Sequence, residues 1–67
     1  MRILFISDGV TLLTVEPEPL DVTVVPRVGE YVFLPEARGK EVQWQVLAVA
    51  HFPMVDRVDV HLTLPGR

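Results

Sequence analysis

Residues 57–64, RVDVHLTL, carry the pattern that decides the fold. Aliphatic residues occupy every second position, and polar or charged residues occupy the positions between them. A β-strand sends successive side chains to opposite faces, so this alternation predicts a strand with one buried face and one wet face. The predicted buried face comprises Val58, Val60, Leu62 and Leu64, and the predicted wet face comprises Arg57, Asp59, His61 and Thr63.

The preceding segment, residues 41–50 (EVQWQVLAVA), predicts the longest strand of the chain. Its first half alternates in the same way, with two glutamines between the apolar residues Val42, Trp44 and Val46. Continuing the alternation places Leu47 and Val49 on the glutamine face, so both sides of this end are predicted to be buried. Residues 2–7 are also apolar on both sides, which a single small core cannot easily cover.

Turn residues divide the rest of the chain into short strands. Asp8-Gly9 favours a tight hairpin turn, because both residues tolerate a positive φ. Prolines lack the N–H that a sheet ladder needs, so they end strands. No window has the 3.6-residue apolar period of a long helix. The predicted strands are residues 2–7, 10–15, 21–25, 30–34, 41–50 and 57–64.

This spacing predicts an all-β fold, a small barrel of five or six short antiparallel strands formed by residues 1–67 as a single domain. β-Branched residues dominate the composition and suit pleated surfaces. Barrel closure also removes the unpaired strand edges that so apolar a chain would otherwise expose.

Residues 25–64 also carry a recognisable order of segments. The stretch Pro26-Arg27-Val28-Gly29-Glu30-Tyr31-Val32 is followed by the strand containing Trp44 and then by a valine-rich strand. This order resembles small uncharacterised bacterial and phage-type proteins with a Pro-Arg-x-Gly-Glu-x-Val segment, and its hairpins look like those of SH3-like β-barrels. The resemblance implies an SH3-like barrel and implies no activity.

The length, charge and lack of cysteine exclude several classes of protein. A chain of 67 residues makes one small domain, and the absence of cysteine excludes disulfide frameworks and thiolate zinc sites. The longest apolar runs, residues 3–6 and 46–50, are far shorter than the roughly 20 residues of a membrane helix. We therefore expect a cytoplasmic protein without a membrane segment.

The residues with metal-ligand chemistry are His51, Asp56, Asp59 and His61. Imidazole and carboxylate groups suit zinc. However, histidine and aspartate on the polar face of a strand are more often solvated side chains than metal ligands. Ser7 is the single serine, with no histidine near it in sequence, and no glycine-rich loop is present to hold a phosphate. The sequence therefore predicts no catalytic residue, no enzyme activity and no cofactor, and leaves open whether His51, Asp59 and His61 bind a metal.

The excess of apolar surface predicts a homodimer or another protein partner. Aromatic residues with few charges among them are typical of the core of an interface, whereas Trp44 is expected to anchor the domain core. We therefore predict a non-catalytic interaction or assembly module. The predicted interface residues are Tyr31, Phe33, Leu47, Val49, Phe52 and Met54.

An alternative function is binding of single-stranded nucleic acid. Small barrels can stack bases on exposed aromatic rings, and three basic residues, Arg27, Arg38 and Lys40, lie near Tyr31 and Phe33 in sequence. The net charge of −3, with glutamates between these basic residues, weakens the attraction for phosphate. Nucleic acid is therefore the less favoured partner.

Overall fold

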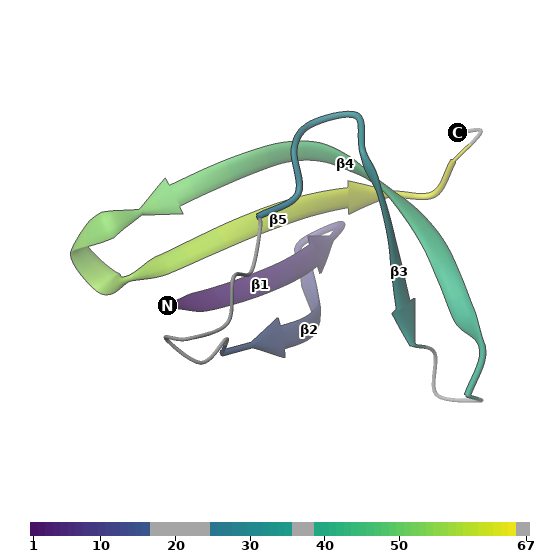
Figure 1. Cartoon of the computed structure of the whole chain (residues 1–67), viewed down its shortest axis with the longest axis horizontal. Helices are drawn as coiled ribbons and strands as arrows, with labels where there is room; N and C mark the ends of the chain where they lie inside the picture. The colour runs from purple at the N-terminus through teal and green to yellow at the C-terminus, as the bar shows by residue number, and fades with distance from the viewer. Residues whose placement is uncertain (17–24, 36–38, 66–67) are drawn as a thin grey trace.

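A computed structural model of the chain describes residues 1–16, 25–35 and 39–65, which form five β-strands and no α-helix (Figure 1). The all-β fold predicted from the alternating patterns is confirmed. A short 3₁₀ turn, η1, covers Pro53–Val55 between the last two strands. The strands are β1 (Arg2–Ser7), β2 (Val10–Val15), β3 (Tyr31–Pro35), β4 (Glu41–Phe52) and β5 (Arg57–Thr63).

The predicted strand bounds agree closely with the observed ones. The first two strands match at both ends, β3 lies one residue later than predicted, and β4 is two residues longer because it continues to Phe52. The fifth strand ends at Thr63, one residue before the predicted end. Of the strand predicted at residues 21–25, residues 21–24 lie outside the described residues, and Val25 is not in a strand.

All five strands belong to one sheet with the order β2-β1-β5-β4-β3. Neighbouring strands are antiparallel except for β1 and β5, which run parallel, a difference from the predicted antiparallel arrangement. Arg2 donates its backbone N–H to the carbonyl of Asp56 at 2.9 Å, which aligns the starts of β1 and β5. Alternation along a strand does not specify the direction of its neighbour, so the sequence pattern could not reveal this pair.

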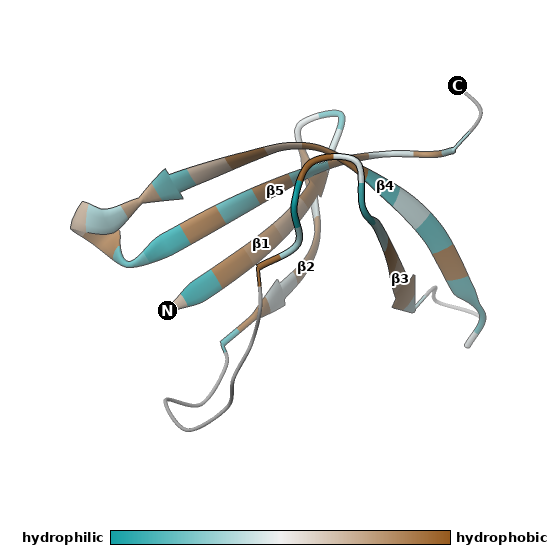
Figure 2. Cartoon of the chain, turned by 45° about the horizontal axis from the view of Figure 1, so that its top comes forward, coloured by the Kyte–Doolittle hydropathy of each residue, from teal (hydrophilic) through white to brown (hydrophobic). Residues whose placement is uncertain are grey.

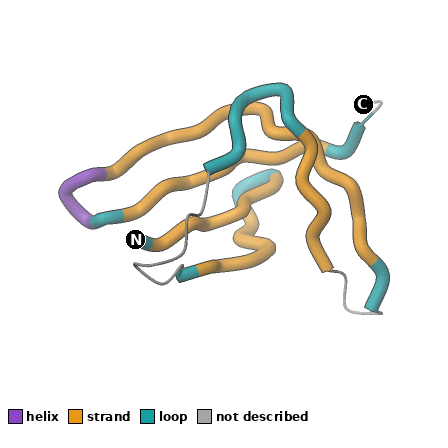
Figure 3. Tube along the Cα trace, viewed as in Figure 1, coloured by secondary structure: helices purple, strands orange, loops and turns teal. Residues whose placement is uncertain are grey.

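The sheet curls into a half-barrel, with β2 and β3 at its two edges (Figures 1 and 3). Hydrophobic and hydrophilic residues alternate along β5, as Figure 2 shows, so one face of the sheet collects the apolar side chains. This concave face holds the core, and the convex face is the outer one. The buried core residues are Ile3, Phe5, Leu34, Val46, Val58, Val60 and Leu62.

The turn between β1 and β2 forms as its sequence predicts. Asp8 has φ of 50° and Gly9 has φ of 77°, so both central residues adopt the left-handed conformation. This backbone matches the twist of the flanking strands, which is why Asp-Gly is favoured in two-residue hairpins.

A bulge in β4 corrects the predicted face of Val49. The β4–β5 register pairs Val46 with Leu62 and Ala48 with His61, so Leu47 is an extra residue without a partner in the ladder. The extra residue shifts the alternation by one position. Val49 is consequently opposite Val60 and packs against the core, rather than sharing the glutamine face as predicted.

Asp59 also differs from the prediction of a wet polar face. Its partners in the register are Leu4 on β1 and Ala50 on β4, so it lies in the middle of the convex face between two other strands. The residue is only 8% exposed. On a central strand, the side chains of both neighbouring strands cover the residues between them. The sequence pattern fits a central strand and an edge strand equally well, so it could not predict this burial.

Candidate interaction surface

The outer side of β3 presents two aromatic rings to solvent. β3 pairs with β4 in an unbroken antiparallel register that places Tyr31 opposite Gln45 and Phe33 opposite Gln43. Directly opposed residues share a face of the sheet, and Leu34, the residue after Phe33, points to the other face and is buried in the core. Tyr31 and Phe33 therefore lie on the convex face, where they are 53% and 60% exposed.

The hydrogen bonds at the start of β3 fix the direction of its backbone groups. Val46 donates its N–H to the carbonyl of Glu30 at 2.9 Å. In an antiparallel ladder, hydrogen-bonded pairs alternate with pairs that are not hydrogen-bonded. The next pair along, Tyr31 with Gln45, is therefore of the second kind, and Tyr31 directs its N–H and C=O away from β4.

The same alternation continues to the end of β3. Val32 and Leu34 direct their backbone groups toward β4, whereas Tyr31, Phe33 and Pro35 direct theirs away from it. Pro35 has no N–H to donate. Because its backbone groups point away from β4, the β3–β4 ladder loses no hydrogen bond at this position. The outer edge of β3 thus offers two N–H donors and three carbonyl acceptors.

This edge has only one of the usual protections against pairing, the proline at its end. Natural edge strands are commonly blunted by charges, by bulges or by an inserted proline, and β3 has no charged residue between Tyr31 and Pro35. Among residues 1–16, 25–35 and 39–65, no strand pairs with its outer side.

The opposite edge of the sheet, β2, is interrupted. The β1–β2 register pairs Phe5 with Leu13 and Ile6 with Thr11, so Leu12 is an extra residue. A bulge breaks the ladder and increases the local twist, and such edges pair poorly with a further strand. The sequence reasoning missed Leu12, although two successive leucines between threonines in VTLLTV are a departure from alternation.

A shallow groove of about 210 Å³ opens between the two edge strands. Leu12 contributes from β2, and Leu34 and Pro35 contribute from β3. Val42 and Trp44 of β4 form the rest of its lining. The groove is apolar because a half-barrel leaves the margin of its core open where the two edges do not pair.

Trp44 joins this groove to a second hollow. The second hollow has a volume of about 290 Å³ and lies near the β1–β2 turn, with Ser7, Asp8, Trp44, Leu47, Leu62, Thr63 and Leu64 around it. Trp44 was predicted to anchor the core, and its half-buried side chain does pack against the core residues. Its ring also lines both hollows.

The other predicted interface residues do not join Tyr31 and Phe33 in one patch. Phe52 and Met54 lie at the β4–β5 turn, where they are 39% and 96% exposed. This turn is at the far end of β4 from the residues that pair with β3 (Figure 1). Leu47 lies between the two groups and is 57% exposed.

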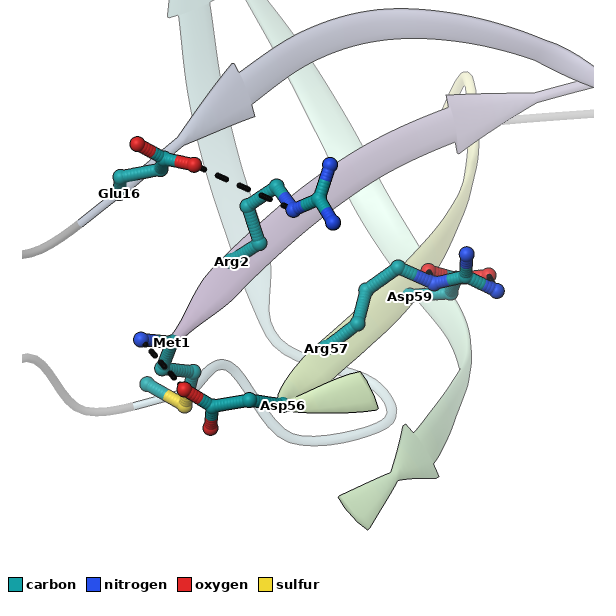
Figure 4. Close-up of polar contacts among 6 residues, drawn as sticks. All are labelled: Met1, Arg2, Glu16, Asp56, Arg57 and Asp59. Carbon is teal, nitrogen blue, oxygen red and sulfur yellow. Dashed lines mark hydrogen bonds and ion pairs between the residues drawn. The ribbon is translucent and has the colours of Figure 1, made fainter. Parts of the chain in front are cut away.

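Arg57 contacts both Phe52 and Asp59 on the convex face, and Figure 4 shows it beside Asp59. Its guanidinium carbon lies 4.5 Å from the centre of the Phe52 ring, and its Nε lies 2.9 Å from Oδ1 of Asp59. These two atoms form an ion pair without hydrogen-bond alignment, and the hydrogen bond that forms, from Nη2 to Oδ2, is 3.5 Å long. The pair gives a largely buried carboxylate its counter-charge, which favours a structural role.

Two further ion pairs in Figure 4 are exposed. The Met1 ammonium lies 3.0 Å from Oδ2 of Asp56, and Arg2 Nε lies 3.9 Å from Oε1 of Glu16. Exposed pairs of this kind contribute about 0–1 kcal/mol each.

The candidate metal ligands are divided between the two faces. His51 is opposite Val58 in the register, on the concave side, whereas Asp59 and His61 lie on the convex side. Within the part of the chain that the structure describes, no three histidine, aspartate or glutamate residues come together as a metal site.

The basic residues of the nucleic-acid alternative are also separated. Arg27 precedes β3, whereas Lys40 lies at the other end of the β3–β4 hairpin, next to the pairing of Glu41 with Pro35. Arg38 lies outside the described residues. The described positions therefore do not form a basic patch beside the rings of Tyr31 and Phe33.

None of the described residues belongs to a helix long and apolar enough to cross a membrane. Comparison with known proteins identifies no matching family model, no matching curated protein and no matching solved structure.

Proposed function

We propose that this chain is a non-catalytic protein-interaction or assembly module that associates with a second copy of itself. The observation that carries the proposal is the exposure of Tyr31 and Phe33 on an uncharged edge strand. Aromatic side chains bury a large area at a small entropic cost, so they are enriched at interfaces. An uncharged edge strand is a ready template for a further strand.

The absence of catalysis and of cofactors is part of this proposal. Asp59, the one buried carboxylate among the described residues, is engaged by Arg57. This engagement supports a structural role for Asp59. We propose the cytoplasm as its location, since a chain without cysteine forms no disulfide that would indicate an oxidising compartment.

The SH3-like relationship is likewise a proposal. The five strands in one curled sheet and the successive β3–β4 and β4–β5 hairpins support it.

Size-exclusion chromatography with light scattering tests the association. At high protein concentration we expect a mass of twice the 7.6 kDa of one chain. Phe33→Ala should weaken the association without lowering the free energy of unfolding of the monomer in dilute solution, because the ring is 60% exposed. Val10→Ala is the matched control, since Val10 is also 60% exposed but lies on β2. A monomer of 7.6 kDa at every concentration would contradict the proposal.

A further inference from the structure

The free edge of β3 specifies how a second copy can bind. Its outward donors and acceptors belong to alternate residues, Tyr31, Phe33 and Pro35, and an antiparallel partner must place its own outward groups opposite them. β3 is continuous in its register with β4, whereas β2 is interrupted by its bulge at Leu12. The regular edge is therefore the one that can accept a strand.

One register satisfies all the outward groups of Tyr31 and Phe33. If Tyr31 of one copy lies opposite Phe33 of the second copy, each of these residues both donates and accepts a hydrogen bond. If instead two Phe33 residues lie opposite each other, Tyr31 faces Pro35, which has no N–H to donate to the Tyr31 carbonyl. In the first register, the carbonyls of Tyr31 and Phe33 each have an N–H opposite them.

From this geometry, and resting on the proposed self-association, we propose that two copies pair antiparallel along β3 with Tyr31 opposite Phe33 of the second copy. The pairing has two-fold symmetry, so the same surface serves both copies. It continues the sheet across the two half-barrels.

The side chains agree with this register. Opposed residues share a face, so each Tyr31 ring lies beside the Phe33 ring of the second copy on the convex side. The register forms two aromatic cross-strand pairs, each contributing roughly 0.2–1 kcal/mol. It also brings Val32 of each copy to the two-fold axis on the concave side.

The charges at the two ends of β3 do not oppose the pairing. Arg27 and Glu30 precede β3, while Lys40 and Glu41 lie at its other end, and all four are exposed. Each end therefore carries one basic and one acidic residue, so antiparallel pairing places no net like charge from the two copies side by side.

Amide hydrogen exchange followed residue by residue in the whole chain tests the pairing. The N–H groups of Val32 and Leu34 point to β4 and should be protected at every protein concentration. Those of Tyr31 and Phe33 should exchange freely in dilute solution. Their exchange should slow on the order of tenfold when about nine chains in ten are paired.

A backbone change separates the edge pairing from contacts made by the rings alone. The chain is short enough for chemical synthesis with an N-methyl group on Phe33, which keeps the ring and removes the outward donor. We expect this form to lose association and, in dilute solution where both forms are monomeric, to keep its free energy of unfolding. Val10→Lys, on the bulged edge strand β2, is the control that should keep association.

The outcomes distinguish this inference from the proposed function. Association with concentration-dependent protection of Tyr31 and Phe33, abolished by the N-methyl group, supports the β3 pairing. Association without that protection, or association that survives N-methylation, would overturn the pairing and leave self-association standing. A chain that never associates overturns both.

Discussion

Arg57 and Asp59 show how a charged pair is held on the face of a central strand. They are two residues apart on β5, so their side chains leave the same face of the sheet. Leu4 and Ala50 flank the carboxylate from the neighbouring strands, and Arg57 covers it. The alternation of RVDVHLTL predicts the shared face, but burial depends on which strands pair beside it.

Removing one partner of this pair should cost more than removing both. Arg57→Met leaves the carboxylate of Asp59 largely buried without a counter-charge, and we expect a loss of about 1–3 kcal/mol in the free energy of unfolding. Arg57→Met combined with Asp59→Leu should be more stable than Arg57→Met, because no unpaired charge remains. Urea denaturation measures both.

The contact of Arg57 with Phe52 is lost in both variants, so their comparison isolates the carboxylate. Arg2→Met, which removes the exposed pair with Glu16, is the control and should change stability by less than about 1 kcal/mol. Equal stability of the single and double variants would show that Asp59 is solvated.

At the scale of the element, β4 depends on its bulge. Its first residues, Glu41–Gln45, pair with β3, and its pairing with β5 begins at Gln45 and continues to Phe52. Leu47 lies just after the change of partner, and β4 curves along its length in Figure 1. A bulge bends a strand and increases its twist, so it helps the sheet to curl around its core.

Deleting Leu47 should be tolerated better than deleting a neighbour. Without this residue, Val46 and Ala48 follow each other with their present partners, and Val49 stays on the core face. Deleting Val49 instead moves Ala50 to the core face and His51 to the convex face. We expect the second deletion to lower the denaturation midpoint much further, as measured by circular dichroism.

Much of the fold and part of the surface follow from the sequence. The period of two predicts β5 within one residue, and the turn residues that divide the chain predict the bounds of β1 and β2. Asp8-Gly9 predicts the first hairpin because both residues adopt a positive φ. The face of Val49 could not be predicted, since a run of apolar residues hides a bulge. The separation of Phe52 from Phe33 could not be predicted either, because it depends on the order of strands in the sheet.

At the scale of the whole molecule, Trp44 connects the core to both hollows. It packs against the core from β4 and lines the groove between the sheet edges. A small domain has few large side chains packed in its core, and its free energy of unfolding is at most about 5–15 kcal/mol. One large side chain therefore contributes a considerable part of it.

Trp44→Ala should destabilise the chain by about 3 kcal/mol, at the low end for a buried tryptophan because the side chain is half-buried. Far-UV circular dichroism during urea denaturation is the measurement, since the variant has no tryptophan fluorescence. Phe33→Ala is the comparison and, in dilute solution where both chains are monomeric, should leave the midpoint nearly unchanged. Equal losses would mean that the assigned faces of Phe33 and Trp44 are wrong.

The parallel pairing of β1 with β5 ties the first strand of the chain to the last. The β1–β2 and β3–β4 contacts join strands that are consecutive along the chain and include no residue of β5, so they can form before β5 emerges. The middle of the sheet cannot, because Arg2 must wait for Arg57 to emerge. Until then β1 and β2 form a ribbon without β5 beside it, and an isolated two-stranded ribbon is only marginally stable in water. This domain therefore becomes stable only after its final strand has left the ribosome.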